Sequence, residues 1–195
     1  MIGSGVERPP TPRPKTTRMM PHKTGALLDP ARATEFIEGY KRFLLTVETA
    51  DRADEGGILE TLVGARRRIT SDPALLHDML ADARKITPGL GDPVLQAIGT
   101  LRVENWVYLR DTRSYAVFMN SSAEFAFGVR ALTQRIRDIV GTSGVMLETG
   151  IVRYCGRYVC DGLVSGVVHL GRNYLRSFAS AYERIRTQGR FEVEC

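Results

Sequence analysis

The chain has few of the residues from which metal sites and disulfide frameworks are built: three cysteines and three histidines among 195 residues. The cysteines, Cys155, Cys160 and Cys195, are odd in number, and no apolar stretch follows the basic N-terminus as in a signal peptide. We therefore expect reduced thiols in a cytoplasmic protein. Cys155 and Cys160 flank a predicted hairpin turn, and the histidines are scattered, so the sequence predicts no metal site and no cofactor.

Long apolar runs and the familiar catalytic motifs are also missing. No run approaches the roughly 20 apolar residues that span a bilayer, so a membrane protein is not expected. Gly89-x-Gly91 does not follow a strand and has no third glycine at the required spacing, so it fails as a dinucleotide-binding fingerprint. There is no phosphate loop, no HExxH pair and no Gly-x-Ser-x-Gly elbow. The sequence therefore offers no recognisable catalytic signature.

The positive charge of the chain lies mostly outside its apolar regions. The net charge is +5, and the composition, 43% hydrophobic and 25% charged, is that of a soluble globular domain. Residues 1–28 have a net charge of +4, which leaves about +1 for the rest. The charged residues of this segment are Arg8, Arg13, Lys15, Arg18 and Lys23 against Glu7. We expect attraction to a nucleic acid or an acidic protein partner to come from this tail.

Proline content separates a tail from a folded domain. Residues 1–27 hold five of the nine prolines and few apolar residues, which predicts a disordered segment, either a passive leader or a docking arm. Residues 28–195 are expected to form a single α+β domain, with a helical part over 28–100. Asp-Pro pairs at Asp29, Asp72 and Asp92 predict three helix starts, and another helix is expected near 58–69.

That additional helix ends in three consecutive arginines, Arg66, Arg67 and Arg68. Cations in the last turn of a helix interact favourably with its dipole. We therefore expect this triplet to be a solvated helix end.

The second part of the domain, residues 101–195, contains a pattern that occurs twice. Residues 106–119 read as a hairpin followed by a helix over 124–140, which the pattern Ser121-x-x-Glu124 introduces as a capping box. Residues 145–164 read as a second hairpin, followed by a helix near 172–186. The predicted fold class is α+β, with N-terminal helices packed on a ββα-ββα body that has a mostly antiparallel sheet of about four strands.

Cations and aromatic residues alternate along both predicted hairpins. Sheets that bind single-stranded nucleic acid use this combination, because guanidinium groups meet phosphates while aromatic rings stack on bases. In the alternative, the tyrosines pack on the sheet and the arginines pair with Asp111, Glu148 and Asp161. The net charge of only about +1 outside residues 1–28 favours this alternative. The candidate binding residues are Arg110, Arg113 and Tyr115 on the first hairpin, and Arg153, Arg157 and Tyr158 on the second.

Three ionisable residues near the second hairpin are the candidates for catalysis. His169 could act as a general base that Asp161 or Glu148 orients, with the Cys160 thiol nearby, as in a small hydrolase or nuclease. In the alternative, His169 is a structural residue at a strand end and Asp161-Gly162 is a turn pair. The enzyme hypothesis requires Glu148, Asp161 and His169 to converge on one pocket.

The turn of the second hairpin adds a geometric expectation. Gly156 is predicted to need a positive φ angle, which glycine adopts without a Cβ clash. Arg157 and Asp161 are four positions apart on one predicted strand, so they should point to the same face. Either the pair is structural or it is a binding surface for one partner, and we favour the structural role.

The order of these elements resembles an uncharacterised family of bacterial cytoplasmic proteins, some of which carry a cysteine-rich segment of the SEC-C kind. This chain has no such segment, and the resemblance implies neither an activity nor a cofactor. The leading hypothesis is thus a non-enzymatic module that binds a macromolecule, with the hydrolase or nuclease as the alternative. The matching stretches are Trp106–Arg110, Tyr115–Phe118, Phe127–Thr133 and Gly156–Val164, with the closing helix that contains Tyr182 and Gly189.

Overall fold

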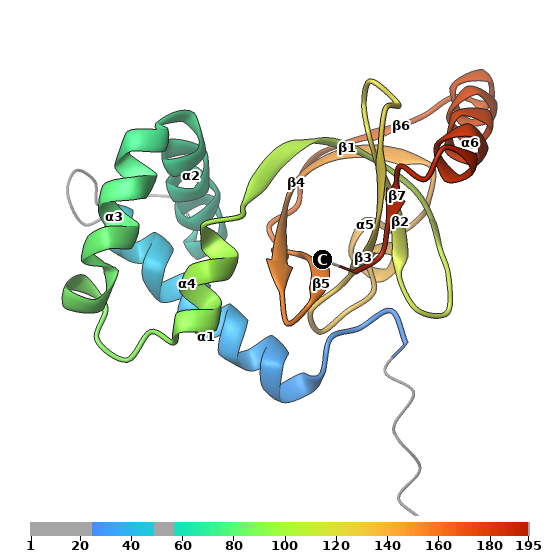
Figure 1. The fold of residues 1–195 in the computed structure, drawn as a ribbon. Helices are drawn as coiled ribbons and strands as arrows, with labels where there is room; N and C mark the ends of the chain where they lie inside the picture. Colours follow the sequence, from blue (N-terminus) through green and yellow to red (C-terminus); the bar gives the residue numbers. More distant parts are fainter. Residues whose placement is uncertain (1–24, 49–56, 195) are drawn as a thin grey trace, which may run out of the picture.

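The computed structural model describes residues 25–48 and 57–194. Four helices come first and lie together on one side of a sheet (Figure 1). They are α1 (Pro30–Glu48), α2 (Ile58–Ser71), α3 (Pro73–Ile86) and α4 (Asp92–Ile98). The remaining elements are β1 (Arg102–Asp111), β2 (Ala116–Asn120), β3 (Ala126–Arg130), α5 (Ile136–Val140), β4 (Val145–Tyr154), β5 (Arg157–Cys160), β6 (Ser165–His169), α6 (Arg172–Thr187) and β7 (Phe191–Glu192).

The helices begin where the Asp-Pro pairs predict. Asp29 accepts hydrogen bonds from the backbone N–H groups that open α1, and Asp72 does the same for α3. The predicted tail ends slightly earlier than residue 27, because Ala26 is buried and Leu27 forms a bridge with Ala131. Residues 1–24 of that tail lie outside the described residues.

Five strands close into a barrel. β1 pairs antiparallel with β2 on one edge and with β4 on the other, β2 pairs with β3, and β3 pairs parallel with β5. β5 returns antiparallel to β4, so the ring closes, and β6 lies along the remaining part of β4. A register shift between Tyr108 and Arg110 bends the long strand β1 as it passes from one partner to the other. This strand order, with α5 between β3 and β4, is that of the OB-fold barrel.

The barrel corrects the finer part of the predicted fold class. The α+β class holds, but the described sheet has seven strands and is mixed rather than four-stranded and antiparallel. The predicted helix over 124–140 is β3, a loop and the short α5. Phe125, Phe127 and Val129 alternate with a period of two, which suits a strand. Ser121-x-x-Glu124 caps no helix; instead the Asn120 carboxamide oxygen accepts hydrogen bonds from the N–H groups of Glu124 and Phe125 and shapes a turn.

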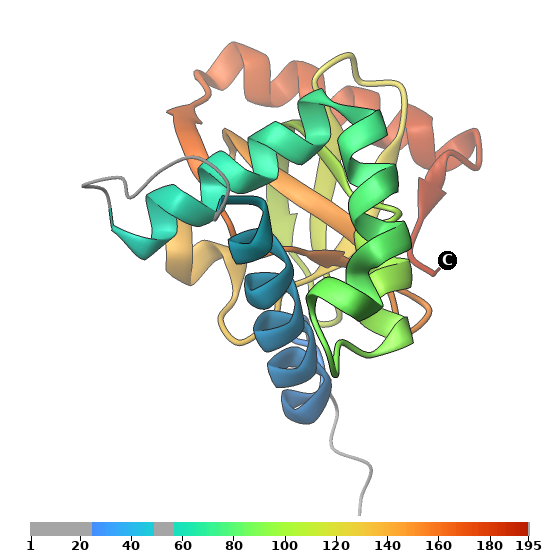
Figure 2. The ribbon, with the colours of Figure 1, turned by 90° about the vertical axis from the view of Figure 1, so that its left-hand side faces the viewer.

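Three apolar clusters hold the molecule together. One fills the barrel interior, where Trp106, Phe118 and Tyr158 are buried. The second joins α1–α4 to the outer face of β4 and β5, as the helical layer in front of the barrel in Figure 2 shows. The third lies between α6 and the outer face of β1 and β2. The barrel is therefore covered by helices on two outer sides.

The β4–β5 turn has the backbone that its glycine predicts. Cys155 and Gly156 both have positive φ angles, +50° and +68°, as in a type I′ hairpin turn. We expect Gly156→Ala to lower the free energy of unfolding by about 1 kcal/mol or more, because a Cβ is strained in the left-handed region. Urea denaturation measures this, with Gly171→Ala as the control at a glycine in open space and with negative φ. Equal losses for both variants would contradict the expectation.

Candidate functional site

A fully buried arginine connects the helical layer to the barrel. Arg66 lies on α2, and its guanidinium donates to the carboxylates of both Asp161 and Glu148, each at 3.1 Å. Its Nη1 also donates to the backbone oxygen of Leu163. The Arg66 side chain and the Asp161 side chain have no exposed surface. A charged pair buried this completely fixes the position of α2 against the β5–β6 connection.

Asp161 is surrounded by further donors. Its Oδ1 accepts hydrogen bonds from the Thr149 hydroxyl at 3.1 Å and from the backbone N–H groups of Gly150 and Leu163 at 3.2 and 3.0 Å. The Tyr40 hydroxyl of α1 lies 3.3 Å from Oδ2. Burial raises the pKa of Asp161 above its ordinary value, although Arg66 and these N–H groups favour the charged form. This carboxylate has no free position for a substrate.

Glu148 lies at the rim of the same cluster. One of its oxygens accepts from the Arg67 guanidinium at 3.1 Å and from the Ser165 hydroxyl at 3.0 Å, in addition to Arg66. Burial alone would raise the pKa of Glu148, but the Ser165 hydroxyl and the two guanidinium groups outweigh it, so the pKa is lowered. Glu148 therefore stays ionised and paired near neutral pH.

This lowered pKa predicts a stability effect that depends on pH. A carboxyl whose pKa falls on folding stabilises the protein above its ordinary pKa of 4.5 and loses that contribution as pH falls through the folded-state value. We expect Glu148→Gln to cost about 1 kcal/mol at neutral pH, and the difference from wild type to shrink below pH 4.5. Urea denaturation at several pH values measures it, with Glu183→Gln as an exposed control. A difference that grows as pH falls would contradict this reading.

The expectation of a solvated helix end is wrong for Arg66 but holds for Arg67 and Arg68, which are both exposed. Arg66 is buried rather than solvated, whereas Arg67 is more than half exposed. The signal is in the helical spacing, because Leu62, Arg66 and Ile69 share one face of α2 and Ile69 is a core residue. An arginine on an apolar face needs a buried acid, and Asp161 follows the buried strand β5.

The three candidate catalytic residues do not converge. Glu148 and Asp161 meet only through Arg66, while His169 is exposed on β6, opposite Val145. A cleft of about 350 Å³ lies beside Asp161 and Cys160, but apolar side chains form most of its wall. Burial raises the pKa of the Cys160 thiol to about 11, so it is protonated near neutral pH. The geometry thus leaves the hydrolase hypothesis without an assembled catalytic set.

Among residues 25–48 and 57–194, no group of three or more histidine, cysteine or acidic side chains is placed to hold a metal ion. No helix in the same part of the chain is long and apolar enough to cross a membrane.

The candidate binding tyrosines pack against other aromatic rings, Tyr158 as a buried side chain and Tyr115 as a partly buried one. The Tyr158 ring is in the barrel interior, 4.3 Å from the Phe127 ring centroid, and Tyr115 lies 5.7 Å from Phe191. The packing alternative therefore describes both tyrosines. Two of the three partners it named for the arginines are wrong, however, because Glu148 and Asp161 bind Arg66.

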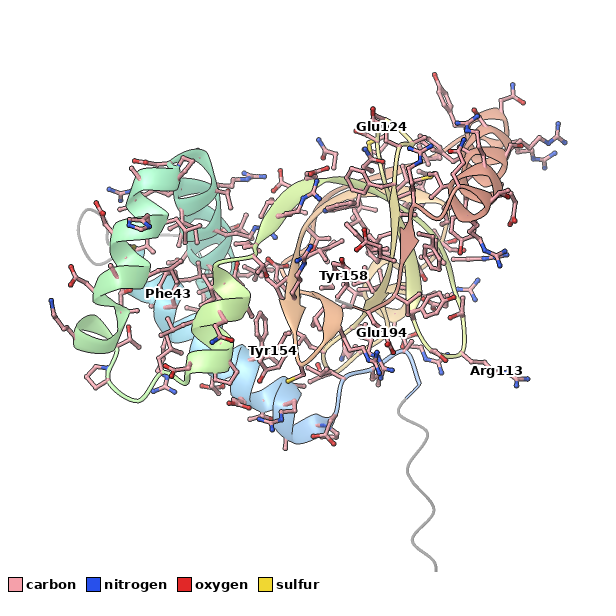
Figure 3. The ribbon with its side chains drawn as sticks, in the orientation of Figure 1. Phe43, Arg113, Glu124, Tyr154, Tyr158 and Glu194 are labelled. Atoms are coloured by element: carbon pink, nitrogen blue, oxygen red, sulfur yellow. The ribbon has the colours of Figure 1, made fainter. Side chains whose placement is uncertain are left out.

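The candidate binding arginines lie at the surface of the barrel. The Arg110 guanidinium sits 5.6 Å from the Tyr182 ring centroid, and the Arg153 guanidinium sits 5.8 Å from that of Tyr158. Arg157 forms an ion pair with Glu194. Figure 3 shows Arg113 pointing away from the body at the same end of the barrel as Glu194. Arg113, Arg153 and Arg157 thus lie near the β1–β2 and β4–β5 turns, whereas Arg110 lies against α6.

Arg157 and Asp161 do not share a face as expected. Arg157 is partly exposed, whereas Asp161 is buried against Arg66. The reason is that β5 ends at Cys160 and the chain turns at Gly162, whose φ is +83°, so the alternation of a strand stops before Asp161.

No protein-family model, curated protein or solved structure matches this chain. The resemblance to a bacterial family therefore stays a prediction, and the function is inferred from the molecule itself.

Proposed function

We propose that this chain is a non-catalytic cytoplasmic module that binds a polyanion, and that a single-stranded nucleic acid is the class of ligand that fits it best. The observation that carries this proposal is the division of charge between the two halves of the domain. Residues 101–195 hold thirteen arginines and nine acidic residues, a net charge of +4, whereas residues 29–100 have a net charge of −3. The near-neutral domain therefore has a basic barrel half, which attracts anionic ligands.

Exposed arginines cover two regions of this half. One is the barrel end with the β1–β2 and β4–β5 turns, and the other is the solvent face of α6. Such turns bind oligonucleotides in other OB-fold barrels, which supports the proposal by analogy of fold only. Since α6 covers the outer face of β1 and β2, we place the ligand on the turns and not on that sheet face. The exposed arginines of this half are Arg102, Arg110, Arg113, Arg135, Arg137, Arg153, Arg172, Arg176, Arg184, Arg186 and Arg190, of which Arg113 and Arg153 lie near the turns and Arg172, Arg176, Arg184 and Arg186 lie on α6.

The alternative, a small hydrolase or nuclease at residues 148–169, has weaker support. Its two carboxylates are neutralised by Arg66 and Arg67, and His169 lies apart from them. A protein partner remains the outcome to consider if nucleic acid does not bind.

Fluorescence anisotropy with a labelled single-stranded oligonucleotide tests the proposal. We expect affinity to fall linearly with salt on logarithmic axes, because binding releases counterions. Removing residues 1–24 should reduce the slope and leave the melting temperature nearly unchanged; the cut precedes Ala26, which is buried. Arg113→Glu with Arg153→Glu should weaken binding further, and Lys41→Glu with Arg42→Glu on the helical half is the charge-matched control. Absence of salt-sensitive binding by the full chain would overturn the proposal.

A further inference from the structure

The segment after α6 returns to the basic end of the barrel. β7 pairs parallel with the first half of β3, where Ala126 is opposite Phe191, while β5 pairs with the second half of the same strand. Glu194 then forms a bridge with Arg157 at the start of β5. Residues 191–194 therefore lie between β3 and the β4–β5 hairpin.

In this segment Glu194 contacts a cation, Glu192 contacts a tyrosine hydroxyl and Phe191 contacts two aromatic rings. The Glu194 carboxylate pairs with the Arg157 guanidinium, and the Glu192 carboxylate accepts a hydrogen bond from the Tyr158 hydroxyl. The Phe191 ring lies 5.7 Å from that of Tyr115 and 5.3 Å from that of Tyr182. A single-stranded nucleic acid offers the same two groups in alternation, an anion and an aromatic ring.

We propose that residues 191–194 occupy, within the same chain, part of the surface on which a single-stranded nucleic acid binds, and so compete with it. This inference rests on the proposed function and assigns its site to the surface around Arg157 and Tyr115 that residues 191–194 cover. A phosphate replaces the Glu194 carboxylate on Arg157, and a base replaces the Phe191 ring against Tyr115.

The contacts that residues 191–194 make with the barrel are weak enough for a ligand to replace them. The Glu194 side chain is 70% exposed and that of Arg157 is 33% exposed, and ion pairs at the surface contribute little to stability. The strand pairing of β7 involves only two residues, so its displacement breaks few backbone hydrogen bonds. The segment thus lowers the affinity of this surface for a nucleic acid without blocking binding.

The test compares two full-length variants that change charge equally. Glu192→Gln with Glu194→Gln removes the internal acids, whereas Glu104→Gln with Glu183→Gln removes two acids that pair with Arg102 and Arg186 elsewhere on the barrel half. Anisotropy titrations use a labelled oligo-dT strand. We expect the first variant to bind about tenfold more tightly than the control variant, with a salt slope steeper by about one, because one more arginine meets phosphate.

The outcomes separate this inference from the proposed function. Equal affinities for the two variants, each above that of wild type, would show a general charge effect and overturn the internal competitor. If no variant binds the strand at low salt, the proposed function itself fails. Glu194→Gln alone serves as a second variant, expected to retain the wild-type melting temperature and to gain part of the affinity; a gain no larger than that of Glu183→Gln would count against the competitor.

Discussion

Asp161→Ala is expected to lower the free energy of unfolding by about 3–5 kcal/mol, because it leaves a buried arginine without its one fully buried carboxylate, with only the partly exposed Glu148 still paired to it. The variant removes the acceptor for Arg66, Thr149 and two backbone N–H groups together. Arg66 cannot turn to solvent, because its side chain is fully enclosed between α2 and the barrel. Urea denaturation followed by circular dichroism measures the loss.

Two controls isolate the ion pair. Glu194→Ala breaks an exposed pair with Arg157 and should cost no more than about 1 kcal/mol. Arg66→Met combined with Asp161→Leu removes both charges, so we expect it to be more stable than Asp161→Ala alone. A loss below about 1 kcal/mol for Asp161→Ala would show that the cluster does not hold the two layers together.

Gly150→Ala is expected to have the second largest effect, about 2–3 kcal/mol of destabilisation. A Cβ at this position would lie 2.3 Å from the Asp161 carboxylate and 2.7 Å from the Leu101 side chain. Both neighbours are fixed, Asp161 by its hydrogen bonds and Leu101 by packing on the helical core. The added methyl group therefore displaces the carboxylate from Arg66.

Thermal and urea denaturation of Gly150→Ala measure this effect, with Gly57→Ala as a control in open space. The same methyl group should cost less in the Asp161→Ala background, since the closest clashing atom is then absent. If Gly150→Ala and Asp161→Ala lower the free energy of unfolding additively, the methyl group does not contact the carboxylate. A smaller loss in the double variant than the sum of the two single losses would show that the strain lies at the Asp161 carboxylate.

Local signals in the sequence predicted much of the secondary structure. The Asp-Pro pairs located α1, α3 and α4, and the turn chemistry at Gly156 located the β4–β5 hairpin. The helix predicted over 124–140 failed because a capping pattern at Ser121 was given more weight than the period-two alternation of Phe125 and Phe127. Both signals are local. The strand β3 forms because β2 and β5 provide hydrogen-bond partners for its backbone N–H and C=O groups.

Local sequence signals could not predict the closure of the barrel or the buried ion pair between Arg66 and Asp161. The pairings of β1 with β4 and of β3 with β5 join segments far apart in the chain, and hairpin patterns report only neighbours. Arg66 was misplaced because a run of arginines resembles a solvated helix end, and its partner Asp161 lies 95 positions away. The sequence nominates the candidate arginines, whose role in binding stays a prediction, but which tyrosines pack and which acids pair with arginines depends on tertiary structure.

The most direct test of the binding proposal is a map of the contact surface by nuclear magnetic resonance. A single-stranded oligonucleotide is titrated into the labelled full-length protein, and changes in backbone amide shifts are followed residue by residue. The account predicts shifts concentrated in residues 110–115 and 153–158 and in the segment 190–194, with small changes over α2 and α3. Shifts confined to the helical half, or none at saturating oligonucleotide, would contradict it.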